Sequence, residues 1–251
     1  MTHLLEEDQA FCRSINDLRC EQVGNFQFPE DCEKARRDNW DALVNRRPEM
    51  FDGRLLRLKS IDVGGQIEFR CEATNFSSYI LSRNPSFTTR FPRSERANPI
   101  GLTLLVATAD DQVLVTQRSL QAEQNPGGLY FVGGFAEPLA DDGAVDLFGE
   151  ATRELVEEIA LVEICRDQSL CIGLGYDPSF CHPELFFLVK TEIAADVVIA
   201  NGARARDRHE ATRIISVPMG EFLGGEATIY RNAPLTWSFK KGPGVPGAAQ
   251  S

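Results

Sequence analysis

The sequence predicts an α+β fold, and three observations support this prediction. Short alternating or apolar runs typical of β-strands recur along the chain, and helical patterns are few. Strands and helices do not alternate regularly, as they would in a protein built from βαβ units. The apolar fraction is 43%, which is enough for a packed core in a chain of 251 residues. We therefore expect one large domain with a substantial N-terminal addition.

The N-terminal part of the chain predicts one helix and one β-hairpin. Residues 31–46 have a helical pattern, and Pro48 follows shortly after them. Residues 54–63 and 66–74 are short alternating runs joined by two consecutive glycines, which is a hairpin signature.

A loop rich in proline and arginine, residues 85–99, indicates a boundary or an insertion. We expect residues 1–98 to form an extension containing the helix and the hairpin, packed on a core of residues 99–240. The C-terminal segment, residues 241–251, is rich in glycine and proline and reads as a flexible tail.

The core region predicts a series of strands and one acidic helix. Two apolar strands turn at Asp110-Asp111, and a polar loop leads to a short strand that contains Gly133 and Gly134. The helix is expected over residues 145–160. The strands are expected at residues 100–109, 112–118, 129–135, 171–176, 184–191 and 212–218.

The acidic helix carries four carboxylates on one side, at offsets of three and four residues: Glu150, Glu154, Glu157 and Glu158. The opposite side carries a stripe expected to face the core: Val145, Phe148, Thr152, Leu155 and Ile159. Like charges at this spacing cost about 0.2–0.5 kcal/mol per pair. The carboxylate side therefore needs either a compensating cation or full solvation.

The segment before the helix favours a cation. Gly133 and Gly134 allow a ligand to approach the backbone closely, and Glu137 follows them in a loop rich in Asp and Gly. A hard cation such as Mg²⁺ prefers oxygen ligands and takes further oxygens from a phosphate substrate. Without this context, an acidic helix face is more often a solvated surface.

The segment "GGFAEP…GEATRELVEEIAL" resembles the signature of the Nudix hydrolases. Residues 153–158 match the R-E-U-x-E-E part of that signature, in which U is aliphatic, and Leu161 matches its closing aliphatic residue. Gly133 and Gly134 match the glycine pair that opens it. The resemblance implies an α/β/α sandwich with a mixed β-sheet between helices.

The signature is altered at three places. The segment from Gly134 to Arg153 is five residues longer than in the family pattern. Ala160 replaces the glycine that normally ends the signature. The first glutamate of the signature has no clear counterpart, because Glu137 comes too early and position 145 is a valine.

The glycine turn with its extended loop is similar to a vertebrate and plant subgroup that hydrolyses UDP-glucose and UDP-galactose. Similarity to that subgroup extends over about residues 30–235. It implies an enzyme, a Mg²⁺-dependent pyrophosphohydrolase that forms UMP and a sugar 1-phosphate, with Mn²⁺ as a substitute metal. Two alternatives remain: a pyrophosphatase for ADP-ribose, an ADP-sugar or another nucleoside diphosphate derivative, and a non-catalytic nucleotide-binding or regulatory protein of the same fold.

The resemblance also implies roles for individual residues. The expected metal ligands are Glu154, Glu157, Glu158 and the backbone carbonyl of Gly133. The expected catalytic residues are Glu154, Glu157 and Glu210 as bases, with Arg153 holding a neighbouring glutamate in place. Residue chemistry, apart from the resemblance, suggests Tyr79 for stacking on a uracil ring, Arg83 for phosphate and His209 for phosphate or sugar. The other substrate contacts expected are Gly134, Glu137 and Arg118.

Composition excludes several other classes of protein. The net charge of −11 argues against a broad nucleic-acid surface. No apolar run approaches the roughly 20 residues of a membrane-spanning helix. The seven cysteines form no CxxC pair, and no secretory signal precedes them, so we expect reduced thiols and a cytoplasmic protein.

Overall fold

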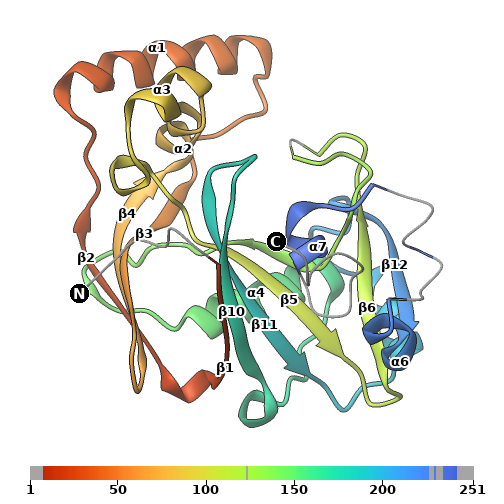
Figure 1. The fold of residues 1–251 in the computed structure, drawn as a ribbon. Coiled ribbons are helices and arrows are strands. Elements are labelled where there is room, and N and C mark those ends of the chain that lie inside the picture. The colour runs from red at the N-terminus through yellow and green to blue at the C-terminus, as the bar shows by residue number, and fades with distance from the viewer. Residues whose placement is uncertain (1–7, 123, 226–228, 230–233, 242–251) are drawn as a thin grey trace.

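The computed structural model describes residues 8–122, 124–225, 229 and 234–241, and its largest element is a mixed β-sheet (Figure 1). The strand order is β1-β10-β11-β5-β6-β12, with β8 paired to β5 and β7 paired to β6. Only β11 and β5 pair in parallel, and all other pairs of this sheet are antiparallel in the described residues. The strands are β1 (Gln9–Ser14), β5 (Gly101–Ala107), β6 (Gln112–Arg118), β7 (Leu129–Tyr130), β8 (Val132–Phe135), β10 (Leu170–Asp177), β11 (His182–Lys190) and β12 (Ala211–Pro218).

A second, smaller sheet has the order β3-β4-β2-β9. Its strands are β2 (Leu18–Asn25), β3 (Arg54–Val63), β4 (Ile67–Asn75) and β9 (Gly143–Ala144). The hairpin predicted around the two glycines is confirmed, since β3 and β4 pair antiparallel up to Val63 and Ile67.

The predicted helices are confirmed within a residue or two, and further short helices are present. The first prediction corresponds to α1 (Glu30–Arg46) and the acidic helix to α4 (Leu147–Ile159). Asparagine side chains cap two of the short helices, because Asn75 accepts a hydrogen bond from Ser78 N and Asn84 accepts one from Ser86 N. The other helices are α2 (Phe76–Ser82), α3 (Pro85–Arg90), α5 (Ala195–Gly202), α6 (Met219–Leu223) and α7 (Trp237–Lys241).

Hydrophobic clusters cover both faces of the large sheet. Alternation along β5 sends Leu102, Leu104 and Val106 to one face and Leu105 to the other. The first face packs against α4, α5 and the small sheet, and the second against α6 and α7. Helices on both faces of a mixed sheet confirm the α+β prediction.

The buried side of α4 differs from the prediction at one position. Phe148, Leu155 and Ile159 are buried as expected, but Thr152 is half-buried and Ala151 takes its place in the core. The reason is that Thr152 lies at the edge of the stripe, where its hydroxyl donates to the Gly149 carbonyl oxygen at 2.9 Å.

The N-terminal part is joined to the rest of the chain by strand pairs. β1 pairs with β10 of the large sheet, and β9 pairs with β2 of the small sheet. A division into an extension of residues 1–98 and a core of residues 99–240 remains a proposal.

Of the expected tail, residues 242–251 lie outside the described residues. In the part of the chain that the structure describes, no helix is long and apolar enough to cross a membrane.

Candidate active site

The glutamates of α4 open onto a cleft beside β8. The cleft has a volume of about 800 Å³ and is bounded on its other sides by the segment from Glu49 to Leu55 and by the loop before β12. We call it the carboxylate cleft. It is lined by Gly133, Gly134, Glu137, Arg153, Glu154, Glu157, Glu158, His209 and Glu210, among others.

Glu154 lies against the backbone of Gly134. A Cβ atom added to Gly134 would be 2.5 Å from Glu154 Oε1, so no side chain larger than hydrogen fits there while Glu154 keeps its position. The pKa of the Glu154 carboxyl is raised to about 7. Burial is the main cause, the charges of Glu157 and Glu210 act in the same direction, and Arg153 opposes them.

Glu158 is the most deeply buried acid of the helix, with 3% of its surface exposed. The Tyr130 hydroxyl donates to Glu158 Oε2 at 2.9 Å. The pKa of Glu158 is raised to about 8. Burial is the main cause and the charges of Glu210 and Glu154 act in the same direction, whereas the hydrogen bond from Tyr130 lowers the pKa. Tyr130 was not among the site residues expected from the sequence, although its place just ahead of the glycine pair indicates that it borders the cleft.

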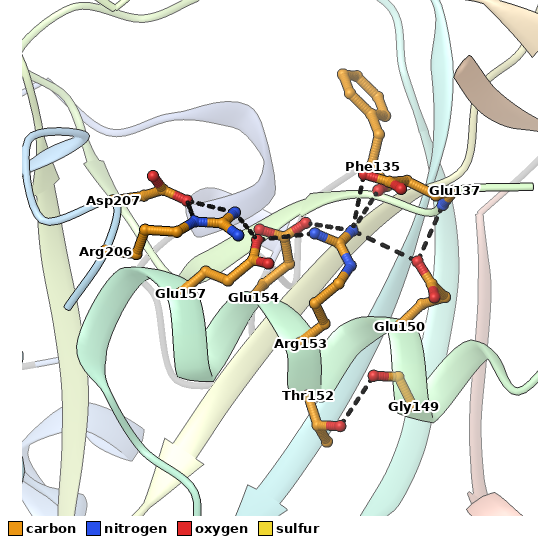
Figure 2. A network of polar contacts seen from close by, with 10 residues as sticks. All are labelled: Phe135, Glu137, Gly149, Glu150, Thr152, Arg153, Glu154, Glu157, Arg206 and Asp207. Carbon is orange, nitrogen blue, oxygen red and sulfur yellow. Dashed lines mark hydrogen bonds and ion pairs between the residues drawn. The ribbon is translucent and has the colours of Figure 1, made fainter. Parts of the chain in front are cut away.

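Arg153 connects the carboxylates of the helix (Figure 2). Its guanidinium is 2.9 Å from both Glu154 and Glu157, 3.4 Å from Glu150 and 3.8 Å from Glu137. Glu157 also pairs with Arg206 at 2.9 Å. The expected pairing of Arg153 with one neighbouring glutamate is thus a network of four carboxylates.

Glu210 reaches the cleft from the loop before β12. The loop is held at both ends, because Glu210 N donates to the Asp207 carbonyl oxygen and Ser119 N donates to the Glu210 carbonyl oxygen. Glu210 and the adjacent His209 are exposed and line the cleft. The structure therefore brings Glu210 to Glu154 and Glu158, more than 50 residues away in sequence, closely enough for its charge to affect both.

The carboxylates suit a hard divalent cation in their donor chemistry. No preformed group of three or more His, Cys, Asp or Glu in metal-binding geometry occurs among the described residues. The reason lies in the ion pairs, since Glu154 and Glu157 are turned toward Arg153 and Arg206. Burial, and then the neighbouring carboxylates, raise the pKa values of Glu154 and Glu158, and a bound divalent cation would stabilise their charged forms.

A second hollow of about 250 Å³, which we call the inner pocket, adjoins the cleft. Both share the residues Phe76, Gly133, Gly134, Phe135 and Glu210. Arg118, an expected substrate contact, lines the inner pocket, where its guanidinium lies 4.7 Å from the centre of the Tyr130 ring. Arg118 Nε is buried and has no hydrogen-bond partner in the described residues.

Two of the expected substrate contacts have other roles in the structure. Tyr79 is fully buried, and its ring packs edge-to-face on Phe76, Phe135 and His182, so it presents no open face to a nucleobase. Arg83 stacks over the rings of Tyr79 and Phe180 and is not among the described residues that line the cleft or the inner pocket.

The inner pocket also contains acids and a histidine that the sequence analysis did not assign. His182 begins β11 and is buried. Glu184 lies two residues further along the same strand, and Asp177 ends β10. The spacing of His182 and Glu184 places both on one face of a strand, which was the available signal.

Comparison with known proteins finds similar chains among the Nudix hydrolases. No family model matches the chain. Human uridine diphosphate glucose pyrophosphatase NUDT22 is 25% identical over 214 residues, covering 71% of this chain and 69% of that protein. Nudix hydrolase 9 of Arabidopsis thaliana is 25% identical over 144 residues, covering 50% of this chain and 46% of that protein. A solved Nudix hydrolase from Alicyclobacillus acidocaldarius has a TM-score of 0.36 and 17% identity, covering 57% of this chain and 87% of that one.

The glycine pair facing the acidic helix and the similarity to these curated proteins support a Nudix hydrolase, an enzyme of the pyrophosphohydrolase class. Within that class it is similar to the group that includes NUDT22. Nudix hydrolases use divalent metal ions and act on small nucleoside diphosphate substrates.

Proposed function

We propose that this Nudix hydrolase cleaves the diphosphate of UDP-sugars, UDP-glucose or UDP-galactose, in a Mg²⁺-dependent reaction that forms UMP and a sugar 1-phosphate. The similarity to the UDP-glucose pyrophosphatases over 71% of the chain supports this substrate class. The observation that carries the proposal is the pair of carboxylates, half-buried Glu154 and buried Glu158, on the cleft beside Gly133 and Gly134.

The metal would be held by Glu154, Glu157 and Glu158, with the backbone carbonyl of Gly133 as a further ligand. When bound, Mg²⁺ supplies charge neutralisation for the diphosphate and lowers the pKa of a coordinated water. This assignment agrees with the chemistry of the cleft, whose described lining offers several carboxylate oxygens, one imidazole (His209) and no thiol.

The remaining steps fall to residues of the chain itself. A carboxylate must accept the proton of the water that attacks phosphorus, and the candidates are Glu154, Glu157 and Glu210. Glu210 is well situated for this role because it borders both the cleft and the inner pocket. Arg153 holds Glu154 and Glu157 in position through its ion pairs.

Arg118 has the properties of a phosphate contact. Its buried Nε has no hydrogen-bond partner in the described residues, and a buried N–H without an acceptor is costly. A phosphate oxygen would supply that acceptor through a charge-assisted hydrogen bond. Glu137 and His209 line the cleft on its exposed side, where they border the same substrate.

The test is product analysis on a panel of UDP-glucose, UDP-galactose, ADP-ribose, an ADP-sugar and a deoxynucleoside triphosphate, with Mg²⁺, with Mn²⁺ and with EDTA. We expect metal-dependent formation of UMP and sugar 1-phosphate from the UDP-sugars. Cleavage of ADP-ribose or the ADP-sugar instead would contradict the substrate and leave the metal site standing. Binding of nucleotides without any turnover would indicate a binding protein that has lost hydrolysis.

A further inference from the structure

The inner pocket is built around a buried chain of polar side chains that the catalytic steps above do not use. His182 Nδ1 is 3.0 Å from the Tyr79 hydroxyl, and His182 Nε2 is 2.9 Å from Glu184 Oε2. The Thr103 hydroxyl donates to Glu184 Oε1. His182, Glu184 and Thr103 are each less than one-tenth exposed, and all three line the pocket.

These hydrogen-bonded side chains come from distant parts of the sequence and meet at the pocket. Tyr79 comes from α2, Thr103 from β5, and His182 and Glu184 from the start of β11. In Figure 1 the turn between β10 and β11 extends beyond the sheet toward α2 and α3. Glu184 is paired with Gly101 across the parallel strands, and a Cβ at Gly101 would collide with Glu184 Oε2. The missing side chain at Gly101 therefore makes room for the Glu184 carboxylate.

Asp177 supplies a second buried carboxylate, with 5% of its surface exposed. Its Oδ1 accepts hydrogen bonds from Ser179 N at 2.7 Å and Phe180 N at 3.1 Å. Its Oδ2 accepts none from the described residues and is not one of the fully buried unsatisfied atoms, so this oxygen is open to the pocket that Asp177 lines. The pocket therefore contains an acceptor that a bound ligand with a hydroxyl donor would satisfy.

We propose that the inner pocket binds the glycosyl ring of the substrate, with Glu184 and Asp177 accepting hydrogen bonds from its hydroxyl groups. This inference rests on the proposed function and adds to it the place and the residues that recognise the sugar. His182, Tyr79 and Thr103 are positioning residues, since they hold the Glu184 carboxylate from both of its oxygens.

The chemistry of the pocket favours a sugar over a nucleobase. A glycosyl ring carries several hydroxyl groups, each of which both donates and accepts, whereas a pyrimidine offers few donors. Besides the two carboxylates, the described lining includes Gln124, Asn125, Thr236 and Ser238, whose amides and hydroxyls complement such groups. The half-buried rings of Phe76 and Phe135 lie on the side that the pocket shares with the cleft, and Tyr79 is fully buried.

The position of the pocket also fits. It shares Gly133, Gly134 and Glu210 with the carboxylate cleft, and Arg118 lies along it. A diphosphate held over the glycine pair would thus place one substituent into the inner pocket and leave the other toward the wider cleft. A volume of about 250 Å³ admits one monosaccharide ring and little more.

The experiment compares wild type with Glu184→Gln, Asp177→Asn and Gly101→Ala on two substrates, UDP-glucose and the methyl ester of UDP, which lacks the sugar. Glu163→Gln and Asp167→Asn are the matched controls, because both residues are exposed acids outside the cleft and the pocket. We expect kcat/KM for UDP-glucose to fall by at least about 10-fold in each pocket variant, as for loss of a hydrogen bond to a charged group. For the methyl ester we expect less than about a 2-fold change.

An equal fall in kcat/KM on both substrates, or no fall on either, would overturn the assignment of the pocket to the glycosyl ring. The proposed function would still stand in that case, because it depends on the cleavage of UDP-glucose by wild type. Gly101→Ala guards against misfolding of the charge variants, since it removes no functional group and displaces the Glu184 carboxylate, with His182 Cδ2 next at 3.1 Å. Isothermal titration with glucose 1-phosphate and with UMP in EDTA gives a readout independent of turnover. In the pocket variants, only the affinity for glucose 1-phosphate should fall. A lower affinity for UMP instead would assign the pocket to the nucleoside.

A wild-type enzyme that cleaves none of the UDP-sugars would refute the proposed function, and the titration would then decide this inference by itself. In that case, unchanged glucose 1-phosphate affinity in Glu184→Gln, or absence of binding by wild type, would overturn it as well.

Discussion

Glu154 of the acidic helix rests directly on the α-carbon of Gly134, with 2.5 Å between its Oε1 and the position that a Cβ at residue 134 would occupy. The contact explains why a glycine pair and a glutamate about 20 positions later belong to one signature. The strand approaches the helix so closely that only hydrogen fits between the backbone and the carboxylate. Gly133 is equally restricted from the other side, because a Cβ there would collide with the Leu102 carbonyl oxygen.

Gly134→Ala should therefore displace the Glu154 carboxylate without removing any polar group. Because misplacing a reacting or coordinating group by about 1 Å can cost about 100-fold in rate, we expect a loss of that order in kcat/KM for UDP-glucose. Gly65→Ala is the control, since nothing lies within 4 Å of the added carbon. Wild-type activity in Gly134→Ala would show that the contact with Glu154 has no part in the reaction.

Glu158→Gln should remove turnover while preserving the fold. The amide keeps the shape and the capacity to accept the hydrogen bond from Tyr130, but it loses the charge that a divalent cation needs. We expect kcat to fall by more than about 100-fold at saturating Mg²⁺, a larger loss than removal of a supporting residue gives. Circular dichroism should be unchanged, and Glu163→Gln should retain full activity. Retained turnover in Glu158→Gln would refute its assignment as a metal ligand.

Local pattern in the sequence was sufficient for the scaffold of the site. The 3.6-residue period of α4, the alternation along the strands and the two consecutive glycines each depend on neighbours within one element. The carboxylate face and its opposing glycine pair could therefore be predicted. The buried side of α4 was correct except at Thr152, where a small residue, Ala151, faces the core instead.

The polar chain of the inner pocket could not be predicted in the same way. Tyr79 and His182 are separated by 103 residues, and only the packing of α2 against the β10–β11 turn brings them to hydrogen-bonding distance. The burial of the histidine in "FCHPELFF" could not be predicted from its neighbours in sequence, because its contacts other than Glu184 include Tyr79 and Phe135 from distant segments. Tyr130 was missed for a related reason, since its role depends on the depth at which Glu158 is buried.

Tyr130→Phe should weaken the metal site without touching a ligand. The hydroxyl of Tyr130 is the donor that favours the charged form of Glu158, so its loss should raise the pKa of Glu158 further. We expect the Mg²⁺ concentration for half-maximal activity to rise by about 10-fold, as for other groups that orient metal ligands. Tyr176→Phe is a matched change, since Tyr176 is a buried tyrosine whose hydroxyl bonds to Asn98 instead. An unchanged metal requirement in Tyr130→Phe would contradict this role.

The metal-free protein should lose stability as the pH rises, through Glu158. Its pKa in the folded state is about 8, above the ordinary value of 4.5, so the folded state retains a proton that the unfolded state releases between these values. The contribution of Glu158 to the free energy of unfolding is therefore neutral below about pH 4.5 and unfavourable above about pH 8. Chemical denaturation in EDTA should show Glu158→Gln gaining stability over wild type across this window, by an amount on the order of a few kcal/mol.

Saturating Mg²⁺ should reverse that difference, because a bound cation stabilises the ionised carboxylate in wild type and cannot do so in the amide variant. A stability difference that stays constant with pH in EDTA would mean that Glu158 is already compensated by other groups.

Ala160→Gly should stabilise the protein. Ala160 ends α4 in the left-handed conformation, with φ of 54° and ψ of 32°, at the position where the family signature has glycine. For a residue with a Cβ this left-handed conformation costs about 1–2 kcal/mol. Glycine avoids that cost, but its more flexible unfolded state offsets part of the gain in stability. We expect the free energy of unfolding to rise by about 1 kcal/mol, measured by urea denaturation, with kcat unchanged because the cap lies beyond the last ligand.

Ala203→Gly is the opposite case, since Ala203 ends α5 with φ of −61° and ψ of −17°, where a Cβ costs nothing. That variant should lose about 0.5–1 kcal/mol. If both alanine-to-glycine changes destabilised the protein equally, the conformation at Ala160 would not be strained, and the replacement of the signature glycine would need another explanation.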